Sequence, residues 1–178
     1  TLNPIRHLDP MGTILMFFVG FGWGKPVPVN QINLNKGRQG MAAVAVSGPI
    51  ANILVATVAA IPLRLNMLDS FPQHSFNFLN TGGIDIFVGT LLVFILAFNV
   101  LLAVFNLIPL FPLDGSSVVL GILPHKLSRN FAKLERYGPV ILMLVIAADF
   151  TFRFGILWSI IRPMVNYVVH ILLGQSLF

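Results

Sequence analysis

A proline-rich segment interrupts the apolar middle of this chain and reads Phe105-Asn106-Leu107-Ile108-Pro109-Leu110-Phe111-Pro112-Leu113-Asp114-Gly115. Its two prolines fix φ and remove amide donors, so a helix arriving from the preceding apolar run is broken here. Backbone broken at membrane depth is tolerated only where it is buried in protein or lines a polar cavity. An aspartate in such a place is costly and is by default a functional-site candidate. A second interpretation stays open, in which Asp114 caps a short helix that starts at Gly115 at the membrane edge.

The composition is that of a membrane protein. Of the 178 residues, 56% are hydrophobic and 10% are charged, against about 25% charged in an average soluble domain. The length suits a single membrane domain over residues 1–178. The absence of cysteine excludes disulfides, thiolate metal sites and a cysteine nucleophile. The net charge of +5 is dispersed along the chain, which favours loops that flank a membrane over nucleic-acid binding.

Three apolar stretches are long enough to cross a bilayer, which takes about 20 helical residues. They are residues 41–63, 84–105 and 137–161. Two apolar stretches are shorter. Residues 11–23 are expected to form a partial span, a re-entrant segment or the end of a helix begun upstream, and for 164–178 both spanning and lying in the interface stay open. The sequence therefore predicts an all-α, polytopic membrane fold with one proline-broken helix.

Charge predicts the orientation of these spans. Seven of the eleven basic residues lie in segments 25–38 and 125–136, which are two spans apart and so share one side of the membrane. The positive-inside rule makes that side cytoplasmic. The loop 65–83 has no Lys or Arg and faces outward. The segment from Gly20 to Asn30 contains two prolines and is expected to form an extended, membrane-associated loop.

The proline-rich segment resembles the Asn-x-x-Pro-x-Pro-x-Leu-Asp-Gly motif of the site-2 protease family of intramembrane zinc metalloproteases. The matching residues are Asn106, Pro109, Pro112, Leu113, Asp114 and Gly115. Three further pieces resemble the bacterial branch of that family in the expected order. They are residues 2–13, the loop 21–30 and the Gly-x-x-x-Asn motif at Gly48 and Asn52. The resemblance covers residues 1–140, and 141–178 then form the last span and the tail.

The resemblance implies a protease that cuts segments of membrane proteins in the bacterial inner membrane. Zinc (Zn2+) is held in this family by two histidines of a His-Glu-x-x-His helix and by a distant aspartate, which Asp114 matches. Asn106 matches the motif asparagine near the substrate carbonyl, where an amide donor steadies an oxyanion. Gly48 and Asn52 match a helix that packs beside the catalytic one.

This chain departs from the family pattern in one respect. Its one glutamate, Glu135, follows a leucine, and no two of its four histidines stand four apart, so the His-Glu-x-x-His helix is absent. We therefore expect a fragment that begins after the zinc helix, supplies one of three metal ligands and is inactive alone. Two alternatives stay open: a non-catalytic homologue that binds membrane segments, and a transporter fragment with a broken helix at an ion site.

Overall fold

The computed structural model describes residues 8–19, 24–25, 37–68, 84–152 and 155–174. The chain divides into two compact units, Thr1–Leu34 and Asn35–Phe178, and each is considered by itself. The single membrane domain expected over the whole chain stays a prediction.

In the described part of the first unit there is one short helix, α1, at Pro10–Val19. The Asp9 carboxylate caps it, because Oδ1 accepts a hydrogen bond of 2.9 Å from the Gly12 N–H. Leu8 and Gly24 form an isolated antiparallel bridge. Most of the extended loop expected over residues 20–30 lies outside the described residues.

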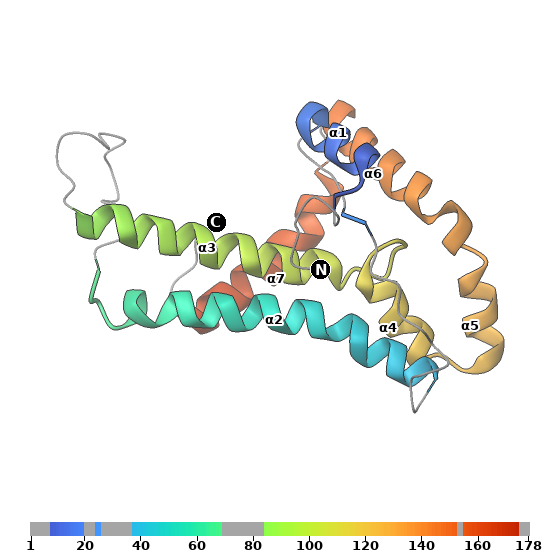
Figure 1. Ribbon diagram of the computed structural model, residues 1–178, viewed down its shortest axis with the longest axis horizontal. Helices are drawn as coiled ribbons and strands as arrows, with labels where there is room; N and C mark the ends of the chain where they lie inside the picture. The colour runs from blue at the N-terminus through green and yellow to red at the C-terminus, as the bar shows by residue number, and fades with distance from the viewer. Residues whose placement is uncertain (1–7, 20–23, 26–36, 69–83, 153–154, 175–178) are drawn as a thin grey trace. The chain divides into compact units, whose positions relative to one another are not determined.

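Helices make up the described part of the second unit (Figure 1). In chain order they are α2 (Arg38–Arg64), α3 (Ile84–Asn106), α4 (Asp114–Ile122), α5 (His125–Ala132), the 3-10 turn η3 (Glu135–Tyr137), α6 (Gly138–Phe152) and α7 (Ile156–Leu173). Within the described ranges, α2, α3 and α7 are long and apolar enough to cross a membrane. The first two confirm the spans predicted at 41–63 and 84–105, and the all-α fold class is confirmed with them.

The third predicted span, 137–161, is wrong. The helix α6 stops after 15 residues, and α7 starts after Gly155, whose φ of 65° lies in the left-handed region. The Asp149 carboxylate accepts a hydrogen bond of 2.7 Å from the Ile156 N–H at the start of α7. The third membrane-capable helix is therefore α7, which takes up most of the tail 164–178 whose position, across the membrane or in the interface, the sequence leaves open.

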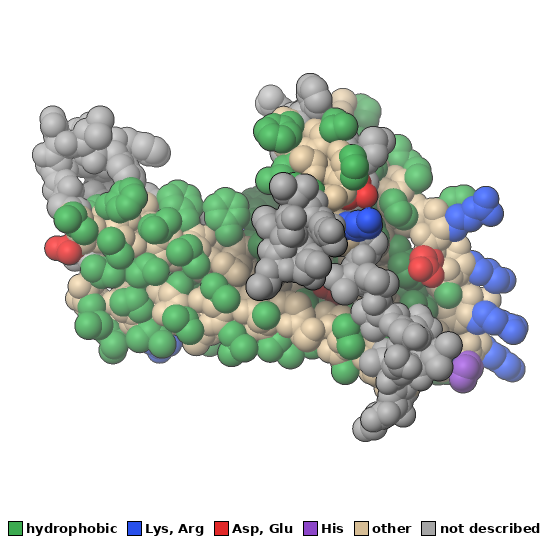
Figure 2. Space-filling view, in the orientation of Figure 1, with side chains coloured by type: hydrophobic (Ala, Val, Ile, Leu, Met, Phe, Trp, Pro, Cys, Tyr) green, Lys and Arg blue, Asp and Glu red, His purple; other side chains and the backbone are tan. Residues whose placement is uncertain are grey.

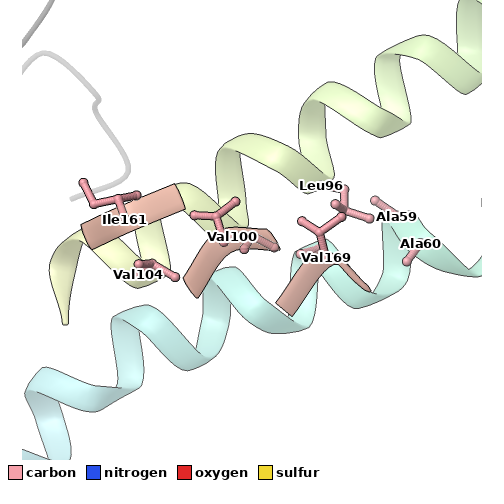
Figure 3. Packing of buried hydrophobic residues seen from close by; sticks show 9 residues of the cluster. Ala59, Ala60, Leu96, Val100, Val104, Ile161 and Val169 are labelled. Atoms are coloured by element: carbon pink, nitrogen blue, oxygen red, sulfur yellow. The ribbon is translucent and has the colours of Figure 1, made fainter. Parts of the chain in front are cut away.

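The core of this unit lies where α2, α3 and α7 meet (Figure 3). Its buried members are Ala56, Ala59, Ala60, Leu96, Val100, Val104, Ile161, Val165 and Val169. Alanines on α2 let the helix backbones approach closely, as is common between membrane helices. Arg64, the last residue of α2, donates a hydrogen bond of 2.8 Å to the Ile171 carbonyl of α7. The C-terminal ends of α2 and α7 therefore lie side by side.

The short helix α4 packs against the first half of α2 (Figure 1). At Gly121 the two helices are so close that a Cβ would fall against Ala42 Cβ. Arg38 Nη2, in the first turn of α2, donates a hydrogen bond of 2.6 Å to the Leu123 carbonyl at the end of α4. This hydrogen bond places the C-terminal end of α4 beside the N-terminal end of α2. The first residue of α4, Asp114, therefore lies further along α2, towards the middle of that helix.

Candidate metal-binding site

The predicted break between α3 and α4 is present and occupies residues 107–113. Backbone hydrogen bonds within the turn replace those of a helix, including one of 2.8 Å from the Leu113 N–H to the Leu110 carbonyl. Both motif prolines, Pro109 and Pro112, are exposed. Pro112 stands one position later than the second proline of the family motif, where this chain has Phe111.

Phe111 contributes to packing at that position. Its side chain is buried, and its ring centroid lies 5.2 Å from that of Phe131. Gly138, the first residue of α6, lies so close that a Cβ there would fall against Phe111 Cβ. The turn is therefore held between α5 and α6.

Gly115 folds the start of α4 back onto the end of α3. A Cβ at this position would fall well inside contact distance of the Leu107 and Ile108 carbonyl oxygens. Only glycine fits such an approach without moving backbone. Because Leu107 directly follows Asn106, the turn brings the backbone next to Asp114 back to the end of α3.

Asp114 is the first residue of α4, and its side chain reaches α2. An ideal Cβ built on Gly48 lies 3.3 Å from Asp114 Oδ2 and, among the described residues outside its own helix turn, meets no other atom within 4 Å. Among the described residues, no group donates a hydrogen bond to this half-buried carboxylate. The helix begins at Asp114 itself, after an N-cap at Leu113 that makes no side-chain bond. The interpretation of Asp114 as a cap for a helix starting at Gly115 is therefore not supported.

This contact lies well inside the length of α2. Gly48 comes ten residues after Arg38 and sixteen before Arg64, which is about 15 Å and 24 Å at a rise of roughly 1.5 Å per residue. If α2 crosses the bilayer, the Asp114 carboxylate is at membrane depth. A half-buried charge with no donor among the described residues is costly there, so this position favours a bound cation or a donor.

Two amide side chains singled out in the sequence lie on the helices α2 and α3. Asn52 follows Gly48 by one helical turn on α2, and Asn106 is the last residue of α3. Both are half-buried, and neither side chain hydrogen-bonds to another described residue. Gly48 itself is exposed, so this face of α2 is open beside Asp114.

Comparison with known proteins gives the family of the chain. The profile of Peptidase family M50 matches residues 83–146, which include α3, the break and α4. Over 145 residues, or 82% of the chain, the sequence is 34% identical to "Putative zinc metalloprotease YwhC" of Bacillus subtilis (strain 168). The chain belongs to peptidase family M50. The resemblance to the site-2 proteases is thereby confirmed.

The M50 chain spans 63% of the length of that relative. No solved structure matches it. The M50 match covers Asn106 and Asp114, whereas Gly48 and Asn52 precede the matched range.

The M50 chain carries one suitable zinc ligand in this region. A carboxylate oxygen is an ordinary ligand for zinc, and Asp114 presents one without a competing donor. Within the described ranges, no three His, Asp or Glu residues come together as a complete metal site. By its chemistry Asp114 can serve as one zinc ligand, which is one of the three or four protein ligands that a zinc site requires.

The sequence predicted only a helix-packing role for Gly48, from a small residue four before Asn52, and did not predict its position beside the Asp114 carboxylate. The missing information was the pairing of α2 with α4, which sequence spacing does not give.

Proposed function

We propose that this chain is part of an intramembrane zinc metalloendopeptidase, in which Asp114 is one of the zinc ligands. The observation that carries the proposal is the position of the Asp114 carboxylate beside Gly48, inside the length of α2, where no described residue donates a hydrogen bond to it. The M50 membership and the name of the relative support the same conclusion.

The chain's own residues have separate parts in this proposal. Zinc supplies Lewis acidity, which polarises a peptide carbonyl and makes water nucleophilic near neutral pH. Asp114 holds the metal from the start of α4, and the backbone packing at Gly115 fixes that start against α3. The Asn106 amide donates a hydrogen bond to the carbonyl oxygen as negative charge develops on it. The open face at Gly48 leaves room for an unwound substrate segment.

The other two ligands and the general base are proposed to lie outside these 178 residues, because the sequence contains no His-Glu-x-x-His. We further propose a multi-pass protein of the bacterial cell membrane, with segments 25–38 and 125–136 on the cytoplasmic side. Its partner is a transmembrane segment of a substrate protein.

The experiment is cleavage of a transmembrane model peptide by the full-length protein, reconstituted in liposomes. We expect cleavage that a zinc chelator abolishes and added zinc restores, and that Asp114→Asn loses. Peptide binding without cleavage under any metal condition would indicate a non-catalytic binder. Ion flux without cleavage would indicate a transporter, and either outcome refutes the proposal.

A further inference from the structure

The segment that follows α4 carries a row of four cations, named here the basic stripe: Lys126, Arg129, Lys133 and Arg136. Their spacing of three, four and three residues puts them on one face of a helix. The backbone supports this register, because α5 runs to Ala132, Lys133 and Leu134 keep right-handed helical angles, and η3 follows. All four side chains are exposed. Figure 2 shows the basic side chains in a row along the edge of the molecule that carries α5.

An exposed apolar stripe runs beside the basic one, one residue later in the same register. It consists of Leu127, Leu134 and Tyr137, which are 56%, 47% and 58% exposed. The next face of the helix points inward, where Ser128 Oγ hydrogen-bonds to the Leu120 carbonyl at 3.3 Å. Large apolar side chains left exposed next to cations are typical of a helix that lies in a membrane interface.

The position of the segment agrees with an interfacial location. Arg38 hydrogen-bonds to the Leu123 carbonyl, so the end of α4 lies at the N-terminal end of the α2 span. His125 begins α5 two residues later. The two stripes therefore start at the level where α2 enters the apolar region, which is where lipid headgroups lie.

We propose that the basic stripe and the apolar stripe together bind anionic phospholipid. The apolar stripe contacts the acyl chains, and the Lys and Arg side chains reach the headgroup phosphates. The one acidic residue of this segment, Glu135, is exposed beside the stripe and opposes binding. The proposal concerns a surface separate from the Asp114 contact and does not depend on proteolysis.

The test compares binding of phosphatidylglycerol and phosphatidylcholine, with the same acyl chains, to the full-length protein in detergent by native mass spectrometry. Wild-type protein is expected to bind phosphatidylglycerol at least tenfold more tightly. The combined variant K126Q/R129Q/K133Q/R136Q neutralises the stripe and is expected to remove that preference. Each lost charge is expected to weaken phosphatidylglycerol binding by about fivefold. Unchanged thermal unfolding shows that the variant is folded, since all four side chains are exposed.

A matched variant changes the affinity in the opposite direction. Glu135→Gln adds one net positive charge to the same segment and is expected to tighten phosphatidylglycerol binding by about fivefold, which misfolding does not produce. Excess inorganic phosphate is expected not to displace the lipid, because phosphate lacks the acyl chains. Equal binding of the two lipids, no effect of the four substitutions, or displacement by phosphate overturns the proposal.

Discussion

Replacing Gly48 by alanine should weaken zinc binding while leaving the fold intact. The added methyl meets a single neighbour, Asp114 Oδ2, at 3.3 Å, which is tighter than ordinary contact, so the carboxylate must move by a few tenths of an ångström. Zinc–oxygen bonds of about 2.0–2.2 Å tolerate deviations of only about 0.2 Å. We expect a loss in zinc affinity of about 10- to 100-fold, as when the support of a metal ligand is removed.

The stability of the Gly48→Ala variant towards unfolding should increase, although its zinc affinity falls. Alanine in place of glycine inside a helix contributes about 0.5–1 kcal/mol, and the new methyl displaces no backbone. The assay is chelator competition for zinc on the full-length protein in detergent, paired with thermal unfolding of the zinc-free form. Ser47→Ala is the matched control, because Ser47 is exposed and its hydroxyl bonds only the Val44 carbonyl of the same helix. Wild-type zinc affinity in Gly48→Ala would refute the placement of the Asp114 ligand against α2.

Three other substitutions test neighbouring parts of the account. Gly115→Ala places a methyl against the Leu107 and Ile108 carbonyls and should destabilise the protein by about 1–3 kcal/mol; an unchanged melting temperature argues against the packed turn. Asn106→Ala should keep zinc but cut the cleavage rate about 10²- to 10³-fold, and a wild-type rate removes Asn106 from the mechanism. Arg64→Gln should lose the charged contact with the last carbonyls of α7 and destabilise that helix end by about 1 kcal/mol. Faster hydrogen exchange in the last turn of α7 would show this loss, and unchanged exchange would contradict it.

The spans α2 and α3 could be predicted closely because their boundaries are visible in composition. Charged residues, Arg38 and Arg64, end the apolar run of α2. The break after α3 was equally visible, since proline removes amide donors wherever it stands. Both features are local, and the fold as a whole did not alter them.

The third span could not be predicted from average hydropathy, because residues 137–161 are apolar overall even though Asp149 and Arg153 stand close to the end of α6. The helix stops because Gly155 adopts a left-handed conformation and the Asp149 carboxylate caps the next helix. Hydropathy averages do not register either effect. A glycine six residues after an aspartate in an apolar run was the available signal.

The candidate site was predictable residue by residue but not as a contact. Asp114 and Asn106 followed from the proline-rich motif, whereas their position relative to Gly48 depends on how α4 packs against α2. That packing is set by a close approach at Gly121 and by the bond from Arg38 to the end of α4. Both contacts join residues far apart in the sequence, so they cannot be predicted from residue spacing.

The zinc content of the purified full-length protein and of its Asp114→Asn variant tests the central claim most directly. Asparagine keeps the size of the side chain and removes its charge, so the fold should persist. We expect one zinc per molecule in the wild type and a small fraction of that in Asp114→Asn. Asp85→Asn is the control, because Asp85 is exposed in the first turn of α3, and it should keep the full zinc content. Equal zinc in wild type and Asp114→Asn, or none in the wild type, contradicts the assignment of Asp114 as a zinc ligand.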